Sequence, residues 1–489
     1  MLRNRSVLKT FYRCKHAKTH WSQVDKKIYS RDRAMQTFDD FYGNVYGSRW
    51  KSMRVALLCE KKYVAMVNNF GDEDKTAEML ENDGAMNIRS VYEVQKKNLA
   101  ELKGGVLATD NIKSIDSRVV DFMGAKKDSE IGEIYSDKDR VSHKEEAKAP
   151  ETSHIDYKKP LERVIEEDSD IDYGRIVDPS YGTSGLHEFI PATKIKGMED
   201  FVFESEHYRY YSNTADFPLK IEMEHDFNIP QSLQLYSYEK GNISSFRQPF
   251  KSETGVSSHF FMDGASILPP LALNIKPGDY VLDACAAPGG KSLLMLQTHL
   301  PRILVSSDLS VSRCNRLKRL FKEFVYDFDQ SWDNHRCVVR HQDARTASEY
   351  GVYDKILVDV PCTTDRHSVN SDDNNIFRAN RIKERLKIPE MQAAILSNSI
   401  RLLKPGGSLV YSTCSLSPVQ NDGVVHMALS TAFKEHKITM TINDLSLAMQ
   451  PLYSLMKFEH PKGLKYGQMV IPFLPANFGP MYFCKMTRN

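Results

Sequence analysis

Two cysteines follow strand-like runs of the chain, and a carboxylate stands close to one of them. Asp359 and Cys362 lie in the run DVPC, and Cys414 lies in the run YSTCS. A free thiol has a pKa of about 8.5, so a nucleophilic cysteine needs surroundings that favour the thiolate. A single cysteine in a sheet is usually a buried apolar group, and this is the alternative interpretation of each one. Two cysteines at strand ends, one of them near a carboxylate, indicate a covalent mechanism.

Carboxylates also follow successive strand-like runs. Asp308 ends the second run of the series, Asp343 follows the third, and Asp359 closes the fourth. A carboxylate in this position can accept hydrogen bonds from both hydroxyl groups of a ribose. Helix capping would explain any one of these residues, but their repetition at strand ends favours a nucleoside cofactor over a phosphate-rich one.

A loop of small residues joins the first strand to a helix. It contains neither the complete P-loop pattern nor the G-x-G-x-x-G pattern of dinucleotide-binding folds. Small residues let a ligand approach the backbone closely, and the N-terminus of the following helix favours negative charge. The loop residues predicted to meet the cofactor are Cys285, Ala286, Ala287, Pro288, Gly289, Gly290 and Lys291.

The elements that must position these groups alternate between strand and helix. Strand-like runs occupy 280–284, 303–307, 337–340, 355–360 and 408–412, with helical segments such as 310–324 and 389–403 between most of them. Two further runs, 468–472 and 481–485, flank a turn and predict an antiparallel pair. This alternation indicates a doubly wound, mostly parallel sheet, in which ligands bind at the carboxyl ends of the strands.

The composition is that of a globular protein. The 489 residues include 66 Lys and Arg against 64 Asp and Glu, with 41% apolar and 27% charged residues. No stretch approaches the ~18 consecutive apolar residues expected of a membrane span. None of the eight cysteines forms a C-x-x-C pair, so neither a zinc ribbon nor a disulfide framework is indicated.

The first 24 residues differ from the rest of the chain in charge. They contain six bases and no acid, and their apolar residues recur near helical spacing. An amphipathic, acid-free start without an apolar signal core predicts a mitochondrial targeting sequence over residues 1–24. A basic arm that touches RNA is the alternative.

The next segment is aromatic-rich. Val55, Leu58, Tyr63 and Val67 recur close to a helical period, which predicts a helical extension within residues 25–100.

The middle of the chain is acidic, whereas its last part is basic. Residues 101–200 contain 15 bases and 23 acids with few large apolar groups, so a charged disordered linker is predicted, with an acidic interaction tail as the alternative. A lead-in segment over 201–255 precedes the predicted catalytic domain over 256–489, which contains 27 bases and 21 acids. A polyanion is therefore a possible ligand of this last domain despite the overall balance.

Basic residues cluster shortly after the Cys362 loop. Such a run can follow the phosphates of RNA, or it can be a solvated helix face. The predicted RNA contacts are Arg366, Arg378, Arg381, Lys383, Arg385 and Lys387.

The APGGK loop, the DVPC run and the STCS run, in this order, resemble the Sun-domain (NOL/NOP/Sun) family of RNA cytosine-5 methyltransferases. The similarity extends over 359–369, 411–421 and 476–486. With residues 52–70, the chain is most similar to the mitochondrial branch of the family, which modifies small-subunit ribosomal RNA. No PUA-type RNA-binding module is recognisable here. The mitochondrial branch also lacks one, and it relies on a partner of the mitochondrial transcription-termination-factor family.

The resemblance implies a Rossmann-like class I S-adenosylmethionine-dependent methyltransferase with a mostly parallel seven-stranded sheet. Asp308 would bind the ribose hydroxyl groups, Asp343 the adenine amino group, and Arg313 would support the pocket. Ala344 and Asp359 would also adjoin the cofactor, together with the loop residues from Cys285 to Lys291.

The family mechanism makes Cys414 the nucleophile that adds to C6 of cytosine, so that C5 can accept a methyl group. Cys362 would assist release of the product, and Asp359 would hold N3 and N4 of the base. The residues alone leave the roles of the two cysteines exchangeable, because the Pro-Cys cysteine is the nucleophile in DNA cytosine methyltransferases.

The expected function is therefore formation of 5-methylcytosine in mitochondrial small-subunit ribosomal RNA, in the mitochondrial matrix, with a role in ribosome assembly. The expected partners are mitochondrial ribosomal RNA, mitochondrial ribosomal subunits and a protein of the mitochondrial transcription-termination-factor family. Methylation of a mitochondrial tRNA is one alternative. The other is an assembly factor in which binding matters more than methylation.

Overall fold

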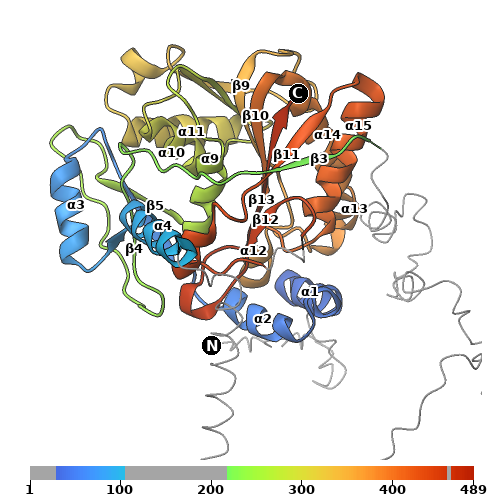
Figure 1. Ribbon diagram of the computed structural model, residues 1–489, viewed down its shortest axis with the longest axis horizontal. Coiled ribbons are helices and arrows are strands. Elements are labelled where there is room, and N and C mark those ends of the chain that lie inside the picture. The colour runs from blue at the N-terminus through green and yellow to red at the C-terminus, as the bar shows by residue number, and fades with distance from the viewer. Residues whose placement is uncertain (1–28, 105–216, 460–463) are drawn as a thin grey trace, which may run out of the picture.

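The structure is a computed structural model that describes residues 29–104, 217–459 and 464–489 (Figure 1). The predicted targeting sequence, 1–24, lies outside the described residues. So does the predicted linker, apart from its first four residues, which end helix α4 (Ile88–Gly104). Within the described ranges, no helix is long and apolar enough to cross a membrane.

A nine-stranded mixed sheet forms the centre of the molecule (Figure 1). Its order is β3-β11-β13-β10-β9-β6-β7-β8, and β12 pairs with β13 off this path. The strands from β10 to β8 are parallel, whereas β13 is antiparallel to β10 and β11. The strands are β3 (Lys220–Met223), β6 (Tyr280–Asp283), β7 (Ile303–Asp308), β8 (Cys337–His341), β9 (Tyr353–Asp359), β10 (Leu403–Thr413), β11 (Met440–Asp444), β12 (Gln468–Val470) and β13 (Met481–Arg488).

This arrangement confirms the predicted Rossmann-like sheet, including the antiparallel pair β12 and β13. The sheet has nine strands rather than the expected seven, because β3 pairs with β11 at one edge and β12 adds to β13. Strand β3 lies in residues 201–255, the segment predicted as a lead-in before the catalytic domain. This segment therefore supplies one strand of the main sheet.

The strand order reverses beside β6. The chain proceeds from β6 to β7 and β8 on one side, and from β9 to β10 on the other, while β6 and β9 are parallel neighbours. Loops that leave the carboxyl ends of β6 and β9 therefore diverge, which is the arrangement that leaves room for a ligand.

Helices cover both faces of the sheet. Helices α10 (Gly290–Gln297) and α11 (Val311–Phe324) pack in one hydrophobic core, and α14 (Ile388–Leu402) and α15 (Val424–His436) pack in the other. Helix α11 buries Cys314, Leu317, Phe321 and Phe324, which recur every three or four residues. The two helices predicted over 310–324 and 389–403 are confirmed to within one residue at each end.

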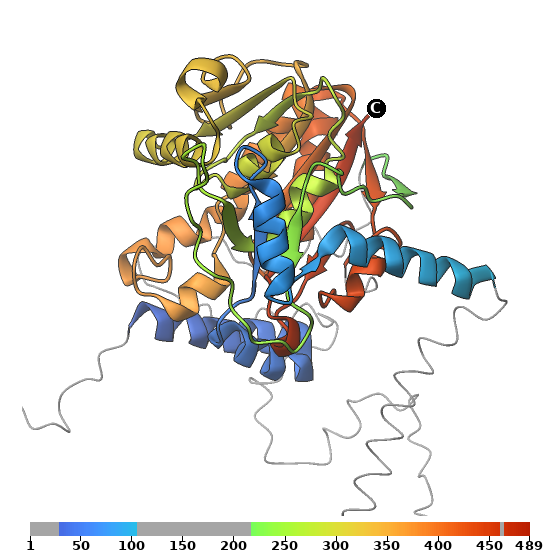
Figure 2. The ribbon, with the colours of Figure 1, turned by 90° about the vertical axis from the view of Figure 1, so that its left-hand side faces the viewer.

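Two N-terminal helices pack on the body at the edge shown at the bottom of Figures 1 and 2. These are α1 (Ser30–Tyr46) and α2 (Trp50–Leu58), and their buried side chains belong to the same core as α14 and α15. The Tyr42 hydroxyl of α1 donates a hydrogen bond of 2.7 Å to Asp365 in α12 (Asp365–Asn370). Helix α4 instead projects from the body (Figure 2).

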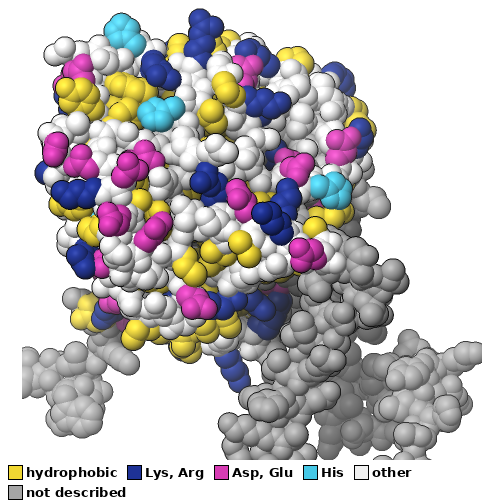
Figure 3. All heavy atoms as spheres, turned by 60° about the vertical axis from the view of Figure 1, so that its left-hand side comes forward, with side chains coloured by type: hydrophobic (Ala, Val, Ile, Leu, Met, Phe, Trp, Pro, Cys, Tyr) yellow, Lys and Arg dark blue, Asp and Glu magenta, His cyan; other side chains and the backbone are white. Residues whose placement is uncertain are grey.

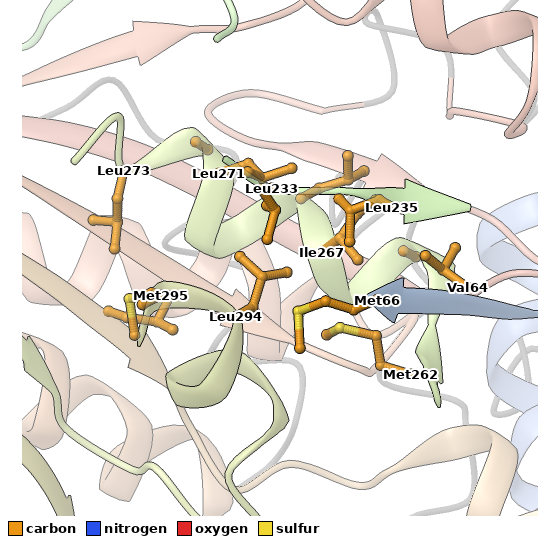
Figure 4. Packing of buried hydrophobic residues seen from close by; sticks show 14 of the residues in the cluster. Val64, Met66, Leu233, Leu235, Met262, Ile267, Leu271, Leu273, Leu294 and Met295 are labelled. Carbon is orange, nitrogen blue, oxygen red and sulfur yellow. The ribbon is translucent and has the colours of Figure 1, made fainter. Parts of the chain in front are cut away.

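A smaller sheet has the order β2-β4-β1-β5. Its strands are β1 (Tyr63–Val67), β2 (Met86–Asn87), β4 (Leu235–Ser237) and β5 (His259–Asp263), and α3 (Glu73–Asn82) lies between β1 and β2 in the chain. One face packs on the large domain, where Val64 and Met66 meet Leu235, Met262 and Ile267 (Figure 4).

The small sheet overturns the helical stripe predicted from Val55 to Val67. Val55 is 49% exposed and Tyr63 is 45% exposed, because the chain changes from helix α2 to strand β1 between them. In a strand, alternate residues face opposite sides of the sheet. A spacing of three or four residues therefore does not predict which residues of Tyr63–Val67 share a face. Pairing of β1 with β5 on one side and β4 on the other stabilises the strand.

Candidate active site

The carboxyl ends of β9 and β10 bring the two predicted cysteines together. Ser412 of β10 pairs in parallel register with Asp359 of β9, so the chain leaves both strands at the same edge. The sulfur atoms of Cys362 and Cys414 lie 3.1 Å apart as a result. The backbone N–H of Thr364 lies 3.4 Å from the Cys362 sulfur and donates to it, with Thr364 at a φ of 44°.

The environment of Cys414 disfavours its thiolate form in this arrangement. The hydrogen bond with Cys362, burial and the charge of Asp359 raise the pKa of Cys414 well above its ordinary value, and the Lys291 ammonium opposes them. A nucleophilic role for Cys414 therefore requires Cys362 to move or to take the proton. The same geometry couples the protonation of the two sulfurs.

An ion pair stands beside the sulfurs. The ammonium of Lys291 lies 2.6 Å from Asp359 Oδ2, and the Ser412 hydroxyl donates to Asp359 Oδ1 at 2.7 Å. Burial lowers the pKa of Lys291, but the charge and hydrogen bond of Asp359 outweigh it and raise that pKa. Lys291 therefore keeps its charge, and both Asp359 oxygens have a donor.

The loop after β6 is shaped for close approach to its backbone. Gly289 has a φ of 113°, and a Cβ atom there would lie 2.7 Å from Leu320 of α11. Glycine is required at this position, because the left-handed conformation and the close contact both exclude a side chain.

The carboxylate that ends β7 adjoins this loop. Asp308 is 2% exposed and accepts a hydrogen bond of 3.0 Å from the Ser310 N–H. Arg313 links the two segments, because its guanidinium donates to the Ala287 carbonyl at 2.6 Å and lies 3.4 Å from Asp308. Two buried acceptors near this loop, Asp283 Oδ1 and Ser307 Oγ, have no hydrogen-bond partner among the described residues. These polar atoms and the small loop residues fit a nucleoside with an amino-acid group.

Asp343 and Ala344 follow β8 at the same edge of the sheet. Arg345 holds Asp343 in a fork, with N–O distances from 2.7 to 3.1 Å, and this contact lowers the pKa of Asp343. Ala344 lines a small cavity together with Ser307 and Gln342. A carboxylate accepts several hydrogen bonds, so Asp343 retains acceptor capacity beside Arg345.

The two sulfurs, the Lys291–Asp359 ion pair and part of the loop after β6 line a cavity of about 680 Å³. The predicted residues that line it are Cys285, Ala287, Pro288, Lys291, Arg313, Asp359, Cys362, Arg366 and Cys414. Ala286, Gly289 and Gly290 lie in the same loop, while Asp308, Asp343 and Ala344 are outside its lining. The structure therefore joins the predicted sulfur pair and most of the predicted cofactor loop in one space.

Similarity to known proteins agrees with this geometry. Residues 270–465 match the family model of the 16S rRNA methyltransferases RsmB/F. The 5-cytosine rRNA methyltransferase nsun-4 of Caenorhabditis elegans is 34% identical over 93% of this chain and 91% of its own length. This chain belongs to the 5-cytosine rRNA methyltransferase family.

A second relative is similar over a comparable length, and a solved structure is similar over about half of the chain. The 5-cytosine rRNA methyltransferase NSUN4 of Xenopus tropicalis is 32% identical over 98% of this chain and 95% of its own length. The solved structure of NSun6 from Pyrococcus horikoshii with SFG is 23% identical and covers 47% of this chain and 53% of that chain, with a TM-score of 0.37. As a member of the 5-cytosine rRNA methyltransferase family, the protein is an S-adenosylmethionine-dependent RNA cytosine-5 methyltransferase.

Arg366 of this methyltransferase makes hydrogen bonds within the protein, and its contact with RNA stays a prediction. Its guanidinium donates to the carbonyl groups of Ala56, Cys59 and Gly479 and to Asn477 Oδ1, at distances from 2.8 to 3.0 Å. Burial lowers the pKa of Arg366. Contact of this guanidinium with RNA would compete with bonds that join the end of α2 to the C-terminal segment at the cavity wall.

The other predicted RNA contacts do not line the catalytic cavity. Arg381 forms an ion pair of 2.6 Å with Glu384, and the Arg385 guanidinium lies 4.6 Å from the centre of the Phe377 ring. Arg378, Lys383 and Lys387 are exposed. The run therefore mixes cations engaged within the protein with cations that are open to solvent, and its contact with RNA stays a prediction.

Several wall residues of the cavity of this methyltransferase carry no local sequence signal. They are Leu58, Cys59, Glu60 and Lys61 before β1, Asp263 and Ser266 near β5, and Gly479, Pro480 and Met481 before β13. The small sheet and the antiparallel strand β13 bring these segments to the cavity from distant parts of the chain. The family resemblance covers two of these segments, through residues 52–70 and 476–486, but it does not indicate that they line the cavity.

Proposed function

We propose that this protein methylates C5 of a cytosine in mitochondrial small-subunit ribosomal RNA, in the mitochondrial matrix. The observation that carries the proposal is the pair of sulfurs, Cys362 and Cys414, 3.1 Å apart beside the Lys291–Asp359 ion pair. Relatives that match more than nine-tenths of this chain are named as 5-cytosine rRNA methyltransferases, which supports ribosomal RNA as the substrate class.

In the proposed reaction, the Cys414 sulfur adds to C6 of the cytosine. Addition converts the ring to an enamine whose C5 is nucleophilic. Asp359 accepts hydrogen bonds from the N4 amino group and a protonated N3, while Lys291 keeps Asp359 in place and favours the thiolate form of Cys414. C5 would then take the methyl group that the cofactor supplies, and loss of the C5 proton, the N3 proton and the Cys414 thiolate would restore the aromatic ring of 5-methylcytosine. Cys362 lies where it can assist this elimination.

The predicted cofactor is S-adenosylmethionine, which supplies an electrophilic methyl group when it is bound. Asp308 at the end of β7 would accept the ribose hydroxyl groups, and Asp343 after β8 would accept from the adenine amino group. Arg313 holds the Ala287 carbonyl, so the loop after β6 keeps its shape around the ligand. Residues Cys285 to Lys291 would surround the amino-acid end.

Target selection in the proposal uses a partner of the mitochondrial transcription-termination-factor family and the ribosomal subunit itself. The face in Figure 3 intermixes acidic and basic side chains, and the catalytic domain has only six more bases than acids. This modest excess of positive charge supports contact with RNA. It does not select one site, because attraction to phosphates carries no sequence information.

A mitochondrial tRNA is the second candidate substrate. The mitochondrial tRNA (cytosine(34)-C(5))-methyltransferase of Danio rerio is 31% identical over 59% of this chain and 72% of its own length. Bisulfite sequencing of mitochondrial RNA with and without the protein separates the two. Loss of one 5-methylcytosine from small-subunit ribosomal RNA is expected, and loss confined to a tRNA would replace the proposal.

A further inference from the structure

A second hollow adjoins the catalytic cavity and shares a wall with it. Its volume is about 730 Å³, and four aromatic rings line it: Tyr63, Tyr238, Phe246 and Phe261. Cys59, Glu60 and Lys61 line both this hollow and the catalytic cavity. We call the four rings and the space between them the aromatic basin.

The small sheet places these rings side by side. Ala65 pairs with Phe261 and Tyr63 pairs with Asp263, so Tyr63 and Phe261 come from adjacent strands on the face away from the large domain. The Phe246 and Phe261 rings are stacked with centroids 5.7 Å apart, and the Tyr238 and Phe246 centroids are 4.6 Å apart. The basin is thus a preformed aromatic surface on a sheet.

We propose that the aromatic basin binds an unpaired nucleotide of the substrate RNA close to the target cytosine. Every nucleobase offers a flat face that stacks on aromatic rings, and such stacking contributes to single-strand binding with little dependence on sequence. The Tyr63 side chain is 45% exposed although it stands in a cluster of rings, so part of its surface remains available to a ligand.

The rim of the basin carries groups that suit a nucleotide. The Lys61 ammonium lies 5.1 Å from the centre of the Tyr63 ring, where a phosphate of a stacked nucleotide would find a cation. Asn242, Ser244, Ser245 and Gln248 also line the hollow and offer donors and acceptors for a base edge. An aliphatic peptide would need fewer polar groups and no cation at this position.

Continuity with the catalytic cavity selects RNA as the occupant. A cytosine that reaches Cys414 must leave its neighbours unstacked, because the reaction occurs in a cavity and not in a helix. The shared wall from Cys59 to Lys61 lies between the two spaces, so one strand can place its target base on one side and a neighbouring base on the other. This inference rests on the proposed RNA methylation and adds a binding site for a second base.

The test uses the full-length protein and a single-stranded oligoribonucleotide with one cytosine and 2-aminopurine at a neighbouring position. Tyr63→Leu removes the stacking surface, Tyr63→Phe retains it, and Tyr326→Ala removes an aromatic side chain that is 55% exposed elsewhere. Tyr63 lines the basin but not the catalytic cavity, which separates this test from the sulfur chemistry.

We expect the wild type, Tyr63→Phe and Tyr326→Ala to quench 2-aminopurine fluorescence equally, and Tyr63→Leu to quench it much less. The KM for RNA should rise about tenfold in Tyr63→Leu, with a smaller change in kcat, since one base stack is lost. Phe246→Leu should act in the same direction. Circular dichroism melting separates these effects from misfolding.

Unchanged quenching and KM in Tyr63→Leu and Phe246→Leu would overturn the inference and favour a protein-docking role for the basin. Failure of the proposed function would look different. The wild type would then bind the oligoribonucleotide and quench its fluorescence but would methylate no cytosine of ribosomal RNA.

Discussion

The ammonium of Lys291 and the carboxylate of Asp359 form an ion pair of 2.6 Å across the point where the strand order reverses. Lys291 belongs to the helix that follows β6, and Asp359 ends β9, so the pair ties the two diverging loops together. The side chains are only 13% and 29% exposed, which limits screening by water. The proposed cofactor loop and the proposed base contact are therefore joined by one ion pair, so a change in one alters the charge beside the other.

Replacement of Lys291 by Met should lower kcat for RNA methylation by about 100-fold or more, the range of a lost acid–base or positioning group. Asp359 would then lose its cation beside the sulfurs, and Cys414 would lose a charge that lowers the pKa of its thiol. Single-turnover transfer of a radiolabelled methyl group measures the effect.

Lys404→Met is the matched control. Lys404 forms an ion pair of 2.7 Å with Asp354 at the other end of β9, with side chains 39% and 30% exposed. That variant should keep the wild-type rate, because it is remote from the sulfurs. Equal losses in the two lysine variants would mean that the ion pairs act through the stability of the sheet and not through the reaction.

The two cysteines should give opposite products when each is replaced by alanine. Cys414→Ala should abolish methylation and form no covalent adduct, whereas Cys362→Ala should accumulate a protein–RNA adduct that survives denaturing gel electrophoresis. The reason is that Cys414 forms the bond to C6, while Cys362 assists its cleavage. RNA binding measured by filter retention should persist in both variants. If only Cys414→Ala formed an adduct, Cys362 would be the nucleophile and Cys414 would assist release.

The contact between the sulfurs also predicts the pH dependence of thiol reactivity. The hydrogen bond with Cys362 is the first cause of the raised pKa of Cys414, so its removal in Cys362→Ala should lower that pKa. At a given pH the variant would hold more thiolate, and alkylation of Cys414 by iodoacetamide would shift to lower pH. Mass spectrometry of the Cys414 peptide follows the reaction.

Cys59 is exposed and serves as the internal reference for that experiment. Its alkylation profile should be the same in the wild type and in Cys362→Ala. A Cys414 profile that stayed in place, or moved to higher pH, would show that the sulfur contact does not suppress the thiolate.

Buried Asp283 should make stability depend on pH. Burial raises the pKa of Asp283 to about 7, against an ordinary value near 3.9 in an unfolded chain. Between about pH 4 and pH 7 the folded protein thus retains a proton that the unfolded chain releases, and the free energy of unfolding falls as pH rises through this window. Urea unfolding at a series of pH values measures the slope.

Asp283→Asn cannot titrate, and its amide oxygen can still accept from Ser292, whose hydroxyl donates to Asp283 at 2.6 Å. The slope attributed to Asp283 should therefore disappear in this variant. Asp226→Asn, in which the replaced side chain is 86% exposed, should retain the slope of the wild type. If the free energy of unfolding changed with pH in the same way in all three proteins, Asp283 would not be the source of the slope.

Much of the large sheet could be predicted from local sequence. The runs that became β6 to β10 are short, apolar and separated by helical spacing, and a parallel sheet buries such runs on both faces. The predicted strand ends also located Asp308, Asp359, Cys362 and Cys414 correctly, because parallel strands place their carboxyl ends at one edge. Strand β3 has no buried residue, so its exposed sequence gave no comparable signal.

The contacts around the site depend on long-range pairing and could not be predicted in this way. The Arg366 guanidinium binds carbonyl groups near residue 56 and residue 479, and no local pattern states that these segments meet. A basic residue beside a catalytic loop looks the same in sequence whether it binds phosphate or a backbone carbonyl. The 3.1 Å contact of the sulfurs likewise follows from strand register, and spacing alone indicates only that both lie at the same edge.

The small sheet draws its strands from both sides of residues 105–216. Strand β1 lies between β4 and β5, which come after that segment, and β1 pairs with both of them. A proteolytic nick within residues 105–216 would accordingly leave two fragments that share a sheet and a core. Co-expression of two such pieces should reconstitute the methyltransferase by fragment complementation. Activity would then depend on the presence of both fragments.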